Sequence, residues 1–330
     1  MARRGSRGRP SPGALPLSRP PRRRGQPATR SAAHPATPST ATTRACAAAT
    51  ALLTLLAAAG CSSSLPGSVS AAPVLSVATG LWPLAQAATA IGGDKAAVVN
   101  VIPAGTDPLT YRPDPAAERI LTSSGLVLEI GDGFQPGIEG SSAGAARVLQ
   151  LGPALGAKNP YVWLDPATMG AAVTRITDAM AAANPAAAAL YRRNAGAFQD
   201  QVHSLGLDYS STLSSCPGTV LVTPDAALST MAAAYGLQDH VIGPAPTPEK
   251  VAAEKAELQA RSAVAVLSES WVDNSGVQQV ASAAGVKVHS VDTLAGSPAT
   301  GTAVQDTYVA RMEQILGVVS GALGCNANEQ

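Results

Sequence analysis

Short apolar runs alternate with helical stretches along most of the chain. The runs are rich in Val, Leu and Ile, and turn residues or segments with helical spacing separate them. The predicted elements are strands at 74–79, 96–102, 126–130, 219–223, 264–268 and 286–291, and helices at 82–91, 116–123, 225–235, 275–284 and 304–323. Strands that alternate with helices in this way favour parallel sheets with helices on both faces.

The longest helical pattern, 185–214, lies between the two sets of strands. Its apolar positions recur three, four or eight residues apart, at Leu190, Phe198, Val202, Leu205 and Leu213. Gly206 weakens the pattern and allows a break there. We therefore predict an α/β fold of two lobes, 74–184 and 215–330, each with a small parallel sheet flanked by helices and joined by one long connecting helix. The alternative is an ordinary surface helix within a single domain.

The first 60 residues are predicted to be a signal peptide. Ten Arg precede or enter an apolar stretch of 16 residues, 45–60, which is shorter than the roughly 20 residues that span a bilayer. The sequence Ala58-Ala59-Gly60-Cys61 resembles a bacterial lipobox, in which the Cys is acylated after cleavage in front of it. Residues 61–73 then form a flexible tether. The alternative is a plain secretory signal with a chance Cys at position 61.

Charge is unevenly distributed along the chain. Residues 61–330 contain 13 basic and 22 acidic residues, a formal charge of −9, although the whole chain has a charge of +1. So acidic a globular part is a poor candidate for nucleic-acid binding, which requires a basic surface. Phe and Trp total only five residues, so the core must be largely aliphatic.

After Cys61 only two cysteines remain, Cys216 and Cys325. An exported compartment permits disulfides, and two Cys so far apart lack the close spacing of a metal motif. We expect one bridge that ties the C-terminal tail to the last domain. Two unpaired buried thiols are the alternative.

Candidate chemistry lies just beyond the predicted strands, because ligands of open parallel sheets bind at the carboxyl ends of the strands. Four Asp stand at such ends in a chain with few charges, namely Asp107, Asp165, Asp225 and Asp292. Catalytic motifs are not found there: the segment 268–270 contains no base, and no phosphate loop with the Gly-Lys-Ser/Thr ending occurs. We therefore expect a binding protein and not an enzyme.

The strand-end segments resemble those of the cluster A-I solute-binding lipoproteins of ATP-driven zinc and manganese importers, which have the ZnuA/TroA-like fold. The segments that carry the resemblance are Val101–Tyr111, Asn159–Pro166, Val222–Ala226 and Val291-Asp292. It extends over residues 74–323. The resemblance implies a monomer on the outer face of the cell membrane, attached through a lipid on Cys61, that delivers a metal ion to an ABC permease.

The usual metal ligands of this family are largely replaced. The first, second and third ligand positions hold Leu109, Tyr161 and Pro224, and only the fourth ligand position keeps its usual residue, as Asp292. A zinc site needs three or four N, S or O donors in tetrahedral array, so a zinc or manganese ion is expected to bind weakly or not at all. Oxygen atoms of Tyr161, Asp225 and Asp292 remain candidates for a hard cation.

The remaining polar candidates have structural explanations. Asp107, Asp165 and Asp225 are expected to cap turns or helices, and Glu269 to accept backbone N–H groups between the lobes. The histidines are not expected to be metal ligands. His203 is predicted on the connecting helix, His240 near the cleft rim, and His289 on the strand face opposite Asp292. Two functions follow: the binding component of a metal importer with a degenerate site, or a relative that binds no metal and acts in docking or carries another solute.

Overall fold

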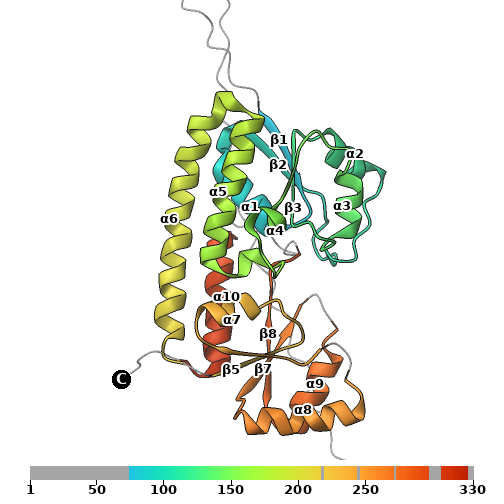
Figure 1. Ribbon diagram of the computed structural model, residues 1–330, viewed down its shortest axis with the longest axis vertical. Helices are drawn as coiled ribbons and strands as arrows, with labels where there is room; N and C mark the ends of the chain where they lie inside the picture. The colour runs from blue at the N-terminus through green and yellow to red at the C-terminus, as the bar shows by residue number, and fades with distance from the viewer. Residues whose placement is uncertain (1–73, 217–218, 244–245, 271–272, 297–305, 326–330) are drawn as a thin grey trace, which may run out of the picture. The chain divides into compact units, whose positions relative to one another are not determined.

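Two groups of parallel strands, one in each half of the chain, organise the computed structural model (Figure 1). The structure describes residues 74–216, 219–243, 246–270, 273–296 and 306–325. The predicted signal peptide, the tether and Cys61 lie outside these ranges. No helix in the described part of the chain is long and apolar enough to cross a membrane.

The N-terminal sheet has the strand order β2-β1-β3-β4, and all of its pairings are parallel. Val77, at the centre of β1, pairs with Val98 of β2 and Leu126 of β3. The strands are β1 Leu75–Thr79, β2 Ala96–Asn100, β3 Leu126–Glu129 and β4 Val148–Gln150, and the helices of this half are α1 Trp82–Gly92, α2 Pro115–Ser123, α3 Pro136–Ser142, α4 Leu151–Leu155 and α5 Pro166–Ala183. The predicted strands and helices of this half are thus present, while α3, α4, α5 and β4 were not predicted.

The C-terminal strands form two parallel pairs, β5 with β6 and β7 with β8, and β5 lies beside β7. Their helices pack around them, α9 against β7 and β8, and α8 against α9. The strands are β5 Val220–Thr223, β6 Gln238–Val241, β7 Ala265–Glu269 and β8 Lys287–Val291, and the helices are α7 Ser229–Ala234, α8 Pro248–Ala260, α9 Ser275–Ala284 and α10 Tyr308–Leu323. Each half therefore has a small parallel sheet flanked by helices, as predicted.

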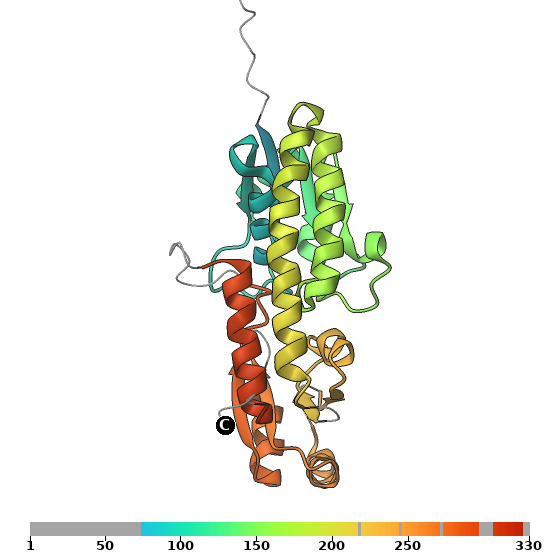
Figure 2. The ribbon, with the colours of Figure 1, turned by 90° about the vertical axis from the view of Figure 1, so that its left-hand side faces the viewer.

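The long helix α6, Ala188–Leu213, follows a short 3₁₀ turn at Pro185–Ala187 and runs unbroken through Gly206. It packs against α5 and α1 and against α10, so it contacts helices of both halves (Figure 2). Two of its buried tyrosines anchor it at either end: Tyr191 Oη donates to the carbonyl of Lys95 (2.7 Å), and Tyr209 Oη to that of Met312 (2.7 Å). The helix is held by hydrogen bonds as well as by apolar packing.

The two halves share one hydrophobic core, which contains residues of β1, α1, α5 and α6 together with residues of β7 and α10. Trp163, fully buried, lies where they meet: its Nε1 donates to the carbonyl of Thr293 (2.8 Å), and its own carbonyl accepts from Tyr308 Oη (2.7 Å). The described residues accordingly belong to one compact unit. The predicted boundaries between lobes at 184 and 214 stay a prediction.

A disulfide joins Cys216, just after α6, to Cys325, just after α10. The two Cα atoms are 5.4 Å apart, and 109 residues separate them in the sequence. Both cysteines are buried, and Ser215 Oγ donates to the carbonyl of Cys325 (3.2 Å). The C-terminal end of the described chain is therefore tied to the start of the C-terminal half.

Candidate functional site

The segment 159–166 brings the N-terminal half against the C-terminal half. It begins with an Asx turn, in which Asn159 Oδ1 accepts from Tyr161 N (2.9 Å), and Asn159 Nδ2 donates to the carbonyl of Ala226 across the junction (2.6 Å). A 3₁₀ turn, Val162–Leu164, follows, and Asp165 then caps α5 by accepting from Thr168 N (2.8 Å). Every residue from Tyr161 to Pro166 is buried.

Tyr161 stands at the centre of the candidate site. Its ring meets Phe134 edge-on, with ring centroids 5.2 Å apart, and only 8% of the residue is exposed. Burial, followed by the charges of Asp225, Glu269 and Asp107, raises the pKa of its hydroxyl far above the ordinary value of 10. The phenol therefore stays neutral and offers one proton and weak acceptor lone pairs, a poor metal ligand.

Glu269, at the end of β7, faces Asp225. It is 1% exposed, and burial together with the charge of Asp225 raises the pKa of its carboxyl to about 9; in the protonated form it donates a hydrogen bond to Asp225. We expected this carboxylate to accept backbone N–H groups, but its Oε1 has no hydrogen-bond partner among the described residues. At neutral pH the Glu269–Asp225 pair therefore holds a proton.

Asp225 forms a turn and does not open a helix. Its Oδ1 accepts from Ala227 N (2.8 Å), its carbonyl accepts from Thr223 Oγ1 (2.7 Å), and α7 begins only at Ser229. The helix predicted from 225 was therefore placed four residues too early. The side chain satisfies the local backbone as an Asx turn does, so the structural role expected for it is present in another form.

Asp107 has the turn role that its position before Pro108 indicates. Its Oδ1 accepts from Leu109 N (2.9 Å) and its Oδ2 from Thr110 Oγ1 (2.7 Å). Leu109, at the first usual ligand position, supplies only a backbone group to this turn. Both carboxylate oxygens of Asp107 are thus used locally, although its charge faces Tyr161.

Asp292, the residue kept at the fourth ligand position, has a cationic neighbour. Its Oδ1 accepts from Leu294 N (3.0 Å), and it lines a pocket of about 220 Å³ together with Ser270 and Arg311. Arg311 Nε donates to Asp306, and Asp292 adds to the negative charge around the guanidinium. The structure thus groups Tyr161 with Asp225, Glu269 and Asp107, while Asp292 lies beside a side-chain cation.

The histidines lie in three different places. His240 on β6 pairs with Glu254 of α8 (Nε2 to Oε2 2.7 Å). His289 is on β8, which ends at Val291, so Asp292 lies past the strand and the alternation of strand faces does not relate the two residues. Within the described part of the chain, no three His, Cys, Asp or Glu side chains are grouped so that they could hold a metal ion.

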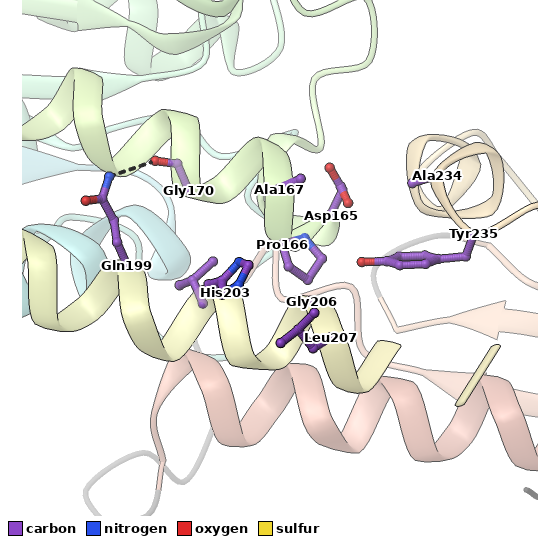
Figure 3. Close-up of a pocket in the computed structure, with 11 residues that line it drawn as sticks. Asp165, Pro166, Ala167, Gly170, Gln199, His203, Gly206, Leu207, Ala234 and Tyr235 are labelled. Carbon is purple, nitrogen blue, oxygen red and sulfur yellow. Dashed lines mark hydrogen bonds between the residues drawn. The ribbon is translucent and has the colours of Figure 1, made fainter. Parts of the chain in front are cut away.

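His203 is exposed on α6. It lines a groove of about 460 Å³ that lies between the start of α5, the middle of α6 and the end of α7 (Figure 3). We call it the junction groove and define it by Asp165, Gly170, His203, Gly206, Leu207 and Tyr235. Sequence reasoning did not find it, because its walls come from segments far apart in the chain.

One segment has the residue spacing of a catalytic nucleophile, but its serine, Ser142, has a structural role. Gly140, Ser142 and Gly144 have the Gly-x-Ser-x-Gly spacing of hydrolase elbows. Ser142, however, is 1% exposed, ends α3 and donates to Glu129 Oε2 (2.6 Å). A nucleophile elbow requires an exposed serine between a strand and a helix, so this serine is no nucleophile.

A family model described as "ZnuA: Zinc-uptake complex component A periplasmic" matches residues 77–322, three-quarters of the chain. The chain belongs to this family. ZnuA family proteins are extracytoplasmic solute-binding components and not enzymes, in agreement with the expectation from the strand-end motifs.

Individual relatives of this ZnuA family chain are distant. The iron-binding protein YfeA of Yersinia pestis is 25% identical over 257 residues, which cover 71% of this chain and 81% of YfeA. The zinc-binding lipoprotein AdcA of Streptococcus pneumoniae is 29% identical over 163 residues, but these span only 32% of AdcA. The periplasmic zinc-binding protein TroA of Treponema pallidum superposes with a TM-score of 0.68 at 19% identity, over 76% of this chain and 99% of TroA. At that identity the likeness establishes the fold.

Proposed function

We propose that this protein is the extracytoplasmic solute-binding component of an ABC metal-ion importer of the zinc and manganese class, and that its metal site is degenerate. The family match over residues 77–322 carries this proposal. Relatives named for iron and zinc binding support the metal class. The protein would act as a monomer, held at the outer face of the membrane by a lipid on Cys61, and would present its two halves to the permease.

The residues at the usual ligand positions argue for weak binding. Leu109 and Pro224 have no donor atom in their side chains, and the hydroxyl of Tyr161 keeps its proton. A hard cation would depend on oxygens of Asp225, Asp292 and Tyr161 with added water. Because Glu269 shares a proton with Asp225, and Arg311 lies beside Asp292, each carboxylate already has a neighbour that competes with a metal ion.

A second candidate function is suggested by the direct contacts between the two halves of the chain. Asn159, Trp163 and Tyr308 connect the two halves by direct hydrogen bonds. A family relative held in one arrangement in this way would dock to a transporter or envelope partner, or carry another solute, without needing a metal ion. The two candidates differ in whether a metal stabilises the fold.

Metal analysis and thermal unfolding with and without Zn²⁺ or Mn²⁺ distinguish them. A ligand at about 100 times its dissociation constant stabilises the folded state by roughly 2.7 kcal/mol, a readily measured shift. The degenerate importer site predicts a small shift that Asp292→Ala and Asp225→Asn each reduce. No shift at millimolar metal would contradict metal carriage and favour the docking function. A shift that survives both substitutions would contradict the proposed residues.

A reconstituted variant tests the assignment of ligand positions independently. Leu109→His, Tyr161→His and Pro224→His together would supply three imidazoles to the retained Asp292. If these positions correspond to those of the family, zinc affinity should rise by about a thousandfold or more, since three or four donors form a zinc site. The matched control carries three His substitutions at exposed positions of α8. Equal zinc affinity in both variants would refute the assignment.

A further inference from the structure

The junction groove is a second concave site, separate from the residues around Tyr161. Its walls come from the first turn of α5, the outer face of α6 and the residue after α7, so elements of both halves enclose it (Figure 3). A volume of about 460 Å³ lies within the range of small-molecule sites. Leu207, with 58% of its surface exposed, stands at its edge.

One buried carboxylate oxygen in the groove wall lacks a partner. Asp165 is 4% exposed; its Oδ2 accepts from Thr168 N (2.8 Å) and Thr168 Oγ1 (2.6 Å), whereas its Oδ1 has no hydrogen-bond partner among the described residues. A buried oxygen without a donor is costly, and the cost is larger for a charged group. The first turn of α5 therefore holds a buried carboxylate whose Oδ1 is closed to solvent and unsatisfied by the described residues, so its negative charge is poorly compensated at the groove wall.

The nearby tyrosine hydroxyls do not donate a hydrogen bond to Asp165 Oδ1. The charge of Asp165 acts on Tyr209, Tyr235 and Tyr308, but Tyr209 already donates to Met312 and Tyr308 to Trp163. Burial, followed by Asp165, raises the pKa of Tyr235 to about 12, so its hydroxyl stays protonated and neutral. Tyr235 extends its ring and hydroxyl toward Asp165 and Pro166 from across the groove (Figure 3).

The other walls are formed by small and apolar residues together with Gln199 and His203. Among the described residues that line the groove there is no Lys or Arg. A Cβ atom added at Gly170 would meet nothing within 4 Å, and one added at Gly206 would lie 3.4 Å from Pro166 Cβ, so the glycines leave the space open. A carboxylate, an aromatic face and largely apolar walls without Lys or Arg suit an organic ammonium ion.

We propose that the junction groove binds a small organic ammonium ion, which is attracted by the negative charge of Asp165 in the groove wall and whose apolar part packs against the ring of Tyr235 and the glycine-lined walls. Because Asp165 follows Tyr161 by four residues in one buried segment, and Tyr235 belongs to the other half, such a ligand would bridge the two halves beside the candidate site. The proposal does not depend on metal binding.

The test is calorimetric titration of the full protein with benzylammonium chloride, and with neutral benzyl alcohol of the same shape. We expect one equivalent of benzylammonium to bind with a dissociation constant of about 1 mM or below, within the limit set by its size, and about tenfold weaker binding of the alcohol. Asp165→Asn retains a helix-capping side chain but removes the charge. It should weaken benzylammonium binding about tenfold.

A matched pair of glycine variants separates occupation of the groove from effects on the fold. Gly170→Leu fills the groove, while Gly196→Leu adds the same side chain on α6, at a glycine that also has open space and does not line the groove. Binding should be lost in the first variant and unchanged in the second. No binding to the wild type, equal binding of ion and alcohol, or undiminished binding in Gly170→Leu would each overturn the proposal.

Discussion

The buried carboxyl of Glu269 should make the stability of the protein depend on pH in a way that one substitution removes. Its pKa is about 9 in the folded protein against an ordinary value of 4.5, chiefly because burial disfavours its charged form and then because Asp225 repels it. Between these two values the folded state binds this proton and the unfolded state does not. Stability is therefore complete below pH 4.5 and is lost progressively as the pH rises toward 9.

The magnitude follows from the size of the shift. Within that window each pH unit lowers the free energy of unfolding by about 1.4 kcal/mol. A rise of about two units, from near pH 5.5 to near pH 7.5, should cost about 2.7 kcal/mol and lower the Tm by roughly 5–10 °C for a chain of this size. Glu269→Gln keeps the shape of the protonated side chain, so it should remove this dependence and raise the Tm at the higher pH.

Thermal and urea unfolding across this range should be compared for the wild type, Glu269→Gln and Glu257→Gln. Glu257 is a suitable control because its side chain is 44% exposed and only pairs with Arg261 on the same helix. Each variant differs from the wild type at a single Glu, so the difference in slope isolates Glu269. If Glu269→Gln and the wild type lose stability equally as the pH rises, the inference of a protonated Glu269 is wrong.

Three further outcomes can be checked by the same unfolding measurements at one pH. Tyr308→Phe leaves the buried carbonyl of Trp163 without its donor and should lower the free energy of unfolding by about 1–3 kcal/mol; an unchanged value would contradict this role. Replacing both Cys216 and Cys325 by Ser should lower it by about 2–5 kcal/mol, because the bond closes a long loop; equal stability of the oxidised wild type and this variant would count against it. Asp114→Ala removes a carboxylate that caps α2 and should cost about 1 kcal/mol, whereas Asp114→Asn should cost much less.

The strand and helix order could be predicted where burial leaves a pattern in the sequence. Strand β7 is buried throughout and β1 is buried except at Ser76, and α6 repeats buried side chains at helical spacing over 26 residues. Strand β6 was missed because none of its four residues is buried, and α8 was missed because Leu258 is its only buried residue. Elements that bury little leave little periodicity to detect.

The candidate site was predictable only in part. The ligand positions Leu109, Tyr161 and Pro224 were assigned from the resemblance and stay a prediction. The neighbours that set the chemistry come from distant parts of the chain: Arg311 lies 19 residues beyond Asp292, on α10, and Glu269 approaches Asp225 from another strand. Which charges become neighbours depends on helix and strand packing, which local spacing does not contain.

The bond between Cys216 and Cys325 also determines what a single peptide-bond cleavage can do to the molecule. Everything from β5 to α10 lies inside the covalent ring that this bond closes. A protease that cuts once anywhere within the ring therefore releases no fragment, and the two pieces remain one molecule on a non-reducing gel until a reductant is added. Damage to a loop in the C-terminal half thus leaves α10 attached to the end of α6, where it continues to cover the shared core.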